Sequence, residues 1–221
     1  MISARAQFLS AGHYKPVIDA LLEFACECRA PGNLLMEVGA GTAYYLARIA
    51  DSMPDHLGLA VDLSKYAARL AAKAHARVDS IVADVWDRLP IAEEASGLTL
   101  NVFAPRQPRE LHRTLRRDGT LLVVTPQSDH LVELRHVLGL LNIDPCKESR
   151  IASGFEPYFR FDARRLLAWT MHLTKADVAA LVGMVPSARH VEASALASRI
   201  AGLSDSIAVT AAVTIQAFGR L

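Results

Sequence analysis

The chain has few cysteines, no long apolar run and almost no net charge, and each shortage excludes a class of protein. Three cysteines, Cys26, Cys28 and Cys146, are too few for a disulfide framework and lack the further ligands of a zinc site. No apolar stretch is long enough to span a bilayer, and the amino terminus lacks the apolar segment of a secretory signal. We therefore expect a cytoplasmic protein with no metal site and no membrane partner.

Excess positive charge is also missing, because 24 Lys and Arg residues face 23 Asp and Glu residues. A protein that holds nucleic acid by its phosphates usually carries a basic excess. One local feature differs: Arg106, Arg109, Arg113 and Arg116 or Arg117 recur at helical spacing. Such a stripe is usually a solvated helix face, and an RNA-facing patch is the alternative interpretation.

What the chain does have is an apolar content of 52% over 221 residues, enough for one large core. Short apolar runs alternate with segments of helical periodicity, which is typical of a parallel sheet covered by helices on both faces. We expect helices at 16–30, at 128–141 and after Thr174, where Asp177 completes a near capping box. The strands are expected at 34–38, 57–61, 79–83, 98–103, 120–125 and, at the edge of the sheet, 207–215.

The stretch LLMEVGAGTAYY, residues 34–45, is the most informative part of the chain. It predicts a strand, a tight turn and a helix whose first backbone N–H groups are free to hold a ligand. A dinucleotide-binding loop has a third glycine where this chain has Tyr44, and the acid Glu37 before the turn would repel a phosphate. An acid at that position suits a ligand that carries an ammonium group.

A second acid, Asp62, ends the next apolar run, where a carboxylate can accept both hydroxyls of a ribose. An ammonium, a carboxylate and a ribose occur together in S-adenosylmethionine, which is therefore the expected cofactor. In an open α/β sheet the ligand lies at the carboxyl ends of the strands. The cofactor-binding residues expected there are Glu37, Gly39, Ala40, Gly41, Tyr45, Asp62, Leu63, Asp84, Val85, Asn101 and Phe103.

Five segments of the chain share their pattern with one known family. They are RAQFLSAGHYKP at 5–16, GLAVDLSK at 58–65, Ala104-Pro105 with the Glu110-Leu111 and Arg113 that follow, Thr125-Pro126 with HLVEL at 130–134, and Met184-Val185-Pro186. These segments resemble the large-subunit ribosomal RNA guanine N1-methyltransferases, a family that also confers resistance to some macrolides in producing bacteria. The resemblance implies an α/β fold of the class I S-adenosylmethionine-dependent methyltransferases, with a Rossmann-like seven-stranded sheet.

We expect a single methyltransferase domain over residues 1–221. Residues 1–30 would form N-terminal lid helices, 31–142 the donor-binding core, and 143–221 the acceptor side with the last strands.

Three departures from the family bear on the acceptor. The family usually begins with a four-ligand zinc module, and this chain starts where that module would end. The tyrosine before the family's Ala-Pro pair is Phe103 here, and its aromatic positions after Met-x-Pro are occupied by residues 187–190, Ser-Ala-Arg-His. On these grounds we favour methyl transfer to a ring atom of a small aromatic N-heterocycle, such as an indole-type natural product. The alternatives are a 23S rRNA guanine N1-methyltransferase and a non-enzymatic donor-binding protein.

A weakly nucleophilic ring atom needs a neighbouring group that removes a proton or polarises the ring. His13 and Tyr14 are the expected catalytic residues, because histidine is the usual general base of proteins and Tyr14 matches a tyrosine of the family. An exposed loop histidine and a packing tyrosine are the alternative interpretations. The substrate-binding residues expected around a flat acceptor are Phe8, Pro105, Phe155, Tyr158 and Phe159.

Overall fold

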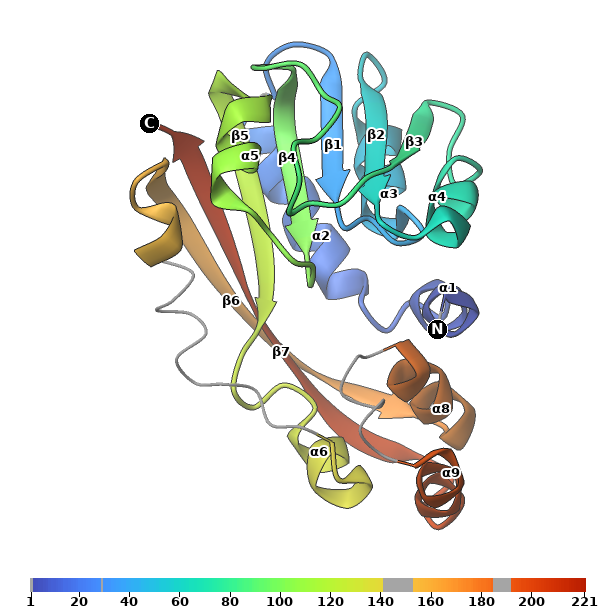
Figure 1. Cartoon of the computed structure of the whole chain (residues 1–221). Helices are drawn as coiled ribbons and strands as arrows, with labels where there is room; N and C mark the ends of the chain where they lie inside the picture. The colour runs from blue at the N-terminus through green and yellow to red at the C-terminus, as the bar shows by residue number, and fades with distance from the viewer. Residues whose placement is uncertain (1, 29, 141–152, 185–191) are drawn as a thin grey trace.

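One seven-stranded sheet organises the molecule (Figure 1). The computed structural model describes residues 2–28, 30–140, 153–184 and 192–221. The strand order is β3-β2-β1-β4-β5-β7-β6, in which β1 to β5 pair in parallel and β7 is antiparallel to both of its neighbours. The strands are β1 Leu34–Val38, β2 Leu57–Asp62, β3 Val78–Val82, β4 Ser96–Val102, β5 Leu115–Pro126, β6 Phe159–Leu173 and β7 Ile207–Arg220.

The helices of the described residues cover both faces of this sheet. They are α1 Ile2–Ser10, α2 Lys15–Glu27, α3 Tyr44–Ser52, α4 Lys65–Ala71, α5 Pro108–Thr114, α6 Val132–Leu138, α8 Lys175–Met184 and α9 Ala193–Ala201. Side chains of a strand point alternately to the two faces. In β1, Leu35 accordingly joins the core cluster under α2 and α3, whereas Met36 and Val38 join the cluster that includes Leu111 of α5. The expected α/β architecture with a parallel sheet is confirmed.

The carboxyl half of the chain differs from the prediction. The last strand, β7, runs to Arg220 and lies between β5 and β6, so it is not the edge of the sheet. The edge strand on this side of the sheet is β6, which was not among the predicted strands. Figure 1 shows β6 and β7 running past the parallel strands toward α6, α8 and α9. A long paired extension therefore projects beyond the carboxyl ends of the parallel strands.

The predicted arginine stripe is wrong. Helix α5 ends at Thr114, and Arg116 and Arg117 belong to strand β5. Arg113 is turned toward the protein, where it pairs with Glu110 at 2.8 Å and donates to the carbonyl of Leu89. These arginines therefore do not form one solvated or RNA-facing helix face.

Helix α1 lies between the parallel sheet and the projecting extension (Figure 1). It packs against α8, and its Phe8 and Leu9 are buried. The predicted box at the start of α8 is confirmed, because the Asp177 carboxylate accepts from the Thr174 N–H and the Asp177 N–H donates to the Thr174 hydroxyl. In the part of the chain that the structure describes, no helix has the length and apolarity to cross a bilayer.

Candidate functional site

The turn after β1 has the backbone that its glycines predict. Gly39 and Gly41 have φ of 75° and 58°, in the left-handed region that favours glycine. A Cβ atom on Gly39 would lie 2.3 Å from the Cβ of Ala104, so glycine alone lets the loop after β4 approach this closely. The backbone N–H groups of Gly39 and Ala40 both donate to the Val61 carbonyl, at 2.8 and 3.0 Å. The turn is thereby fixed to the end of β2.

Asp62 closes the same corner. One carboxylate oxygen accepts from the Gly41 N–H at 2.7 Å and the other from the Ser64 N–H at 2.8 Å. Each carboxylate oxygen has further lone-pair capacity, so a ribose hydroxyl can still donate to it. Asp62 therefore has a fixed orientation at the rim, as a ribose-binding acid requires.

Glu37 lies at the centre of the site with no exposed surface. It follows Leu35 by two residues, so its side chain enters the face covered by α2 and α3. One carboxyl oxygen accepts from the Leu46 N–H in the first turn of α3 at 3.1 Å, and the other, Oε1, has no partner in the structure. Burial raises the pKa of Glu37 to about 8, although nearby Arg5 and the Leu46 N–H act in the opposite direction. An approaching ammonium group would find an acceptor in Oε1.

The loop after β4 borders the site on its other side. The Asn101 amide donates to the carbonyls of Val38 and Pro105, at 3.1 and 3.0 Å, and so ties the end of β1 to this loop. The Asn101 Oδ1 atom is buried without a partner. Phe103 has a φ of 52°, a strained value for a bulky side chain of the kind found at functional sites. Pro105 is exposed beside it.

The rim beyond Asp62 carries exposed apolar side chains. Leu63 is 66% exposed and Trp86 is 63% exposed, and Val85 is half-buried. The Asp84 carboxylate accepts from the Trp86 N–H at 3.0 Å. Large exposed apolar groups beside two strand-end acids suit the flat base of a nucleoside. Leu63, Asp84 and Val85 were among the predicted cofactor-binding residues, but Trp86 was not. Its position two residues after the strand-end acid Asp84 could have indicated it.

Tyr14 and His13 lie among aromatic side chains at the start of α2. The Tyr14 ring contacts Phe8, Phe103 and Trp169, with centroids 5.4 to 5.8 Å apart. His13 lies beside Phe8, and its Nε2 atom is 3.4 Å from the Asp177 carboxylate of α8. Trp169 donates its indole N–H to the His13 carbonyl at 3.0 Å.

His130 completes this cluster, beside Tyr14 and Phe103. Its Nδ1 atom accepts from the Ala212 N–H at 3.1 Å, so the ring proton is on Nε2, which lies 3.2 Å from the Tyr14 hydroxyl oxygen. Burial lowers the pKa of His130 to about 4, which keeps the ring neutral at pH 7. The Tyr14 oxygen therefore accepts from His130, and its own proton remains free to be donated elsewhere.

Burial also raises the pKa of Tyr14, which keeps the phenol protonated. Tyr45, expected to contact the cofactor, is 2% exposed and lies below the turn with its ring edge-on to Tyr44.

Three of the expected substrate-binding residues lie at the wrong end of the sheet. Phe155 and Phe159 pack against Phe218, and Tyr158 lies beside His112. Phe159 pairs with Arg220, the last residue of β7. The neighbouring Gly219 of β7 pairs with Thr120 of β5, and Thr120 pairs with Leu98 near the start of β4. This row is at the amino ends of the parallel strands, whereas the acids are at their carboxyl ends. The structure thus separates Phe155, Tyr158 and Phe159 from the rim, where Phe8, Phe103 and Pro105 are.

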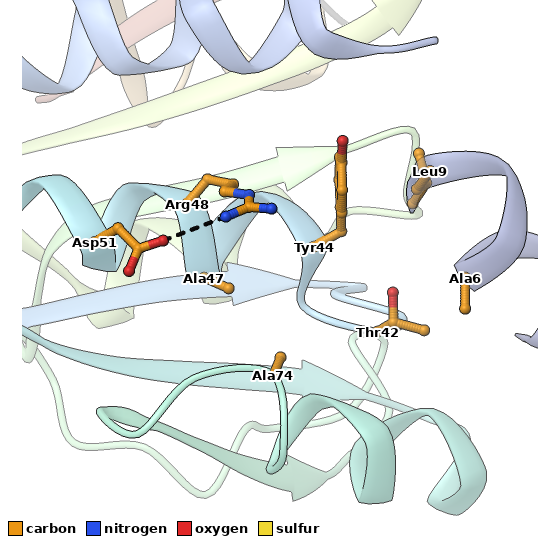
Figure 2. A pocket seen from close by; sticks show the side chains of 8 residues that line it. All are labelled: Ala6, Leu9, Thr42, Tyr44, Ala47, Arg48, Asp51 and Ala74. Carbon is orange, nitrogen blue, oxygen red and sulfur yellow. Dashed lines mark ion pairs between the residues drawn. The ribbon is translucent and has the colours of Figure 1, made fainter. Parts of the chain in front are cut away.

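Two hollows occur outside the acidic rim. A cavity of about 240 Å³ lies between α1 and α3, and Figure 2 shows Leu9, Thr42 and Tyr44 among the side chains that line it. A second, of about 430 Å³, is lined by Phe155, Phe159 and neighbouring side chains at the far end of the sheet. Neither lining includes Glu37 or Asp62. Among the described residues, no group of three or more His, Cys, Asp or Glu side chains is arranged to hold a metal ion.

The residues at the rim fit S-adenosylmethionine. The free oxygen of buried Glu37 suits its ammonium, the fixed carboxylate of Asp62 suits its ribose, and the apolar surface at Leu63 and Trp86 suits its adenine. Gly39, Ala40 and Gly41 supply the close backbone approach.

Comparison with known proteins identifies relatives along nearly the whole chain. A 23S rRNA (guanine(748)-N(1))-methyltransferase of Streptomyces fradiae is 44% identical over 216 residues, which cover 97% of this chain and 77% of that protein. A protein of Micromonospora griseorubida, provisionally assigned as a 23S rRNA (guanine-N(1)-)-methyltransferase, is 43% identical over 99% of this chain and 79% of its own length. No protein-family model matches the chain.

Solved structures share the fold at low sequence identity. The MccD protein matches with a TM-score of 0.59 at 16% identity, over 92% of this chain and 96% of its own. Geranyl diphosphate C-methyltransferase of Streptomyces coelicolor, determined with S-adenosyl-L-homocysteine, matches with a TM-score of 0.55 at 14% identity, over 92% and 77%. The [4+2]-cyclase SpnF matches with a TM-score of 0.57 at 17% identity, over 91% and 80%. These likenesses establish the class I methyltransferase fold, and they do not select a reaction.

The raised pKa of Glu37 predicts how stability depends on pH when no donor is bound. A carboxyl whose folded pKa, about 8, exceeds its ordinary 4.5 stabilises the fold most below pH 4.5, and this contribution is lost as pH rises through 8. Glu37→Gln removes the titration, so the variant should lose less stability than the wild type between about pH 4.5 and about pH 8, by up to ~1.4 kcal/mol per pH unit. Denaturant unfolding measures this. Identical pH profiles for both proteins would show that Glu37 is ionised in the folded chain.

Proposed function

Because the chain belongs to the family of 23S rRNA (guanine-N1)-methyltransferases, we propose that it methylates N1 of a guanine in large-subunit ribosomal RNA. That membership makes it an S-adenosylmethionine-dependent methyltransferase. The observation that carries the proposed acceptor is 44% identity over 97% of the chain to a relative named for that reaction. The site residues described above support it.

The relatives favour ribosomal RNA over the small aromatic acceptor that the sequence alone suggested. That expectation relied on the balanced charge and on the absence of a zinc-module sequence within residues 1–221. A net charge near zero weakens non-specific phosphate binding, but sequence-specific recognition of RNA relies largely on shape and on stacking of unpaired bases. An overall charge of +1 is therefore compatible with an RNA acceptor.

When bound, S-adenosylmethionine supplies an electrophilic methyl carbon for attack by the ring nitrogen. The task of the chain is to hold donor and acceptor in line and to exclude water. Glu37 and Asp62 orient the donor from its two ends, and the turn at Gly39–Gly41 holds it close to the backbone. Phe103 and Pro105, at the end of β4, border the space that a flat base would enter.

Guanine N1 carries a proton that must leave, and negative charge develops on the neighbouring carbonyl oxygen as it does. Tyr14 is suited to donate to that oxygen, because His130 occupies its acceptor side and leaves its proton free. His13 is suited to receive the N1 proton, because the resulting imidazolium would face the Asp177 carboxylate 3.4 Å away. The proton would then move from the base to His13 as the methyl group moves to N1.

The acceptor can be tested directly. Wild-type protein is incubated with methyl-labelled S-adenosylmethionine and either 23S rRNA fragments or a panel of indoles. We expect label in RNA, at a guanine where reverse transcription stops because an N1-methyl group blocks base pairing. Asp62→Ala, checked for folding by its circular dichroism, should reduce the labelling because it removes the ribose contact. Label in the indoles alone would contradict the proposal.

The hydroxyl of Tyr14 has its own test. Tyr14→Phe should lower kcat by roughly a hundredfold, since one hydrogen bond to developing charge is removed. The affinity of the Tyr14→Phe variant for S-adenosylmethionine should equal that of the wild type. Tyr44→Phe is the matched control, because it removes a phenol from the neighbourhood of the turn without touching His130. Equal kcat values for the two variants would reject the role of Tyr14.

A further inference from the structure

We propose that Arg5 of α1 binds the carboxylate of S-adenosylmethionine, opposite Glu37, which binds its ammonium. The methionine end of the donor would then bridge two groups of this chain that carry opposite charges. Arg5 was not among the residues expected from sequence to contact the donor. The inference rests on use of the donor and is independent of the acceptor.

The position of Arg5 is the first observation. Its side chain lies directly over the turn, and a Cβ atom on Gly41 would lie 3.0 Å from Arg5 Nε and 3.3 Å from its guanidinium carbon. Figure 2 shows the adjoining residues of α1, Ala6 and Leu9, facing Thr42 and Tyr44 at the start of α3. The guanidinium therefore lies beside Gly41, above a turn whose own N–H groups are bonded to Val61 and Asp62.

The second observation is that this cation has no acidic partner. The Arg5 Nε atom is buried without a hydrogen bond, and among the described residues no carboxylate lies within ion-pair distance of the guanidinium. The Oε1 atom of Glu37 is also buried and unpartnered. Buried charges are normally paired with each other or with a ligand. An acid and a base that face one site without pairing fit the two ends of an amino-acid zwitterion.

Two other cations near the turn, Arg48 and Lys65, are engaged elsewhere. Arg48 of α3 turns to Asp51, at 3.6 Å, as the dashed line in Figure 2 shows. Lys65 lies over the ring of Tyr66, 5.4 Å from its centroid. Arg5 is also the cation that acts on Glu37, Tyr14 and Tyr45 together, which locates its charge at the centre of the site.

A donor held by Arg5 would connect to the acceptor side through α1. The same helix buries Phe8 against Tyr14 and packs on α8, which carries Asp177 beside His13. Binding of the donor carboxylate would therefore fix the helix that supports the two expected catalytic side chains. The donor site and the acceptor site would be coupled through the position of one helix.

The test compares binding of two donors by calorimetry, without any acceptor. One is S-adenosylmethionine, and the other is its decarboxylated form, which keeps the amine, the sulfonium and the nucleoside. Arg5→Gln should weaken binding of S-adenosylmethionine by roughly ten- to a hundredfold, the usual effect of losing a charge-assisted hydrogen bond. For the decarboxylated donor the same variant should differ from the wild type by less than about threefold, because the partner of Arg5 is absent.

Three controls make the result specific. Arg48→Gln removes a neighbouring positive charge and should leave both affinities unchanged. Arg5→Lys keeps the charge without the planar fork and should recover part of the affinity for S-adenosylmethionine. Wild-type protein alone should bind the decarboxylated donor more weakly by the factor that Arg5→Gln loses, so this comparison stands even if the variant folds poorly.

The outcomes separate the inference from the proposed function. Equal loss of both donors in Arg5→Gln, or no loss of either, would overturn the role of Arg5 and leave donor use intact. Absence of any binding of S-adenosylmethionine to the wild type would instead contradict donor use itself. Selective loss of the carboxylate-bearing donor is the result that we expect.

Discussion

A carboxyl group without exposed surface, Glu37, is the constraint on which the rest of the site depends. Burying a carboxylate is costly unless its oxygens are satisfied, and here one oxygen receives only the Leu46 N–H while the other receives nothing. The raised pKa is the consequence, because the protein relieves the cost by keeping a proton. A ligand ammonium would relieve the same cost by pairing with the ionised form. The cost of ionising buried Glu37 is therefore present in the free protein and would be offset when a ligand ammonium binds.

The surroundings of Glu37 follow from this requirement. Its position on β1 is set by strand alternation, which aims it into the face covered by α2 and α3. The close approach of Ala104 to Gly39 and the two bonds of Asn101 hold β1 and β4 together just beyond it. These contacts are made by the backbone and by small side chains, so they leave the space above the turn to Arg5 and a ligand.

The turn and the strand-end acids could be predicted from the sequence because their signals are local. The turn at Gly39–Gly41, the acid before it and the acid at the end of the next strand follow from spacing along a short stretch, and their convergence follows from the parallel sheet. The predictions that failed depend on contacts between distant parts of the chain. Phe155 and Phe159 were predicted to bind substrate because aromatic residues cluster there in the sequence. The register of β6 on β7 places them at the opposite end of the sheet from the acids. The hydrogen bond between His130 and Tyr14 joins residues 116 positions apart, so no local sequence pattern predicts it.

Strand β6 shows why the carboxyl half resisted prediction. It is an edge strand in which exposed and half-buried residues alternate over much of its length, and charged residues such as Arg160 and Arg164 interrupt its first half. The interior strand β7 is apolar enough to be predicted from the sequence. Its place between β5 and β6 could not be predicted, because β6 itself was not.

The same fold supports a C-methyltransferase and a [4+2]-cyclase, so the sheet and its turn do not decide the reaction. In this chain the groups that we propose to act on the acceptor come from outside the parallel strands. Tyr14 is supplied at the start of α2, His130 by the loop after β5, and Asp177 by α8 on the projecting extension. His130 is itself oriented by the backbone of β7, through the Ala212 N–H. Inserting β7 beside β5 therefore fixes the direction in which the phenol of Tyr14 can donate, and this links the antiparallel part of the sheet to the chemistry at the rim.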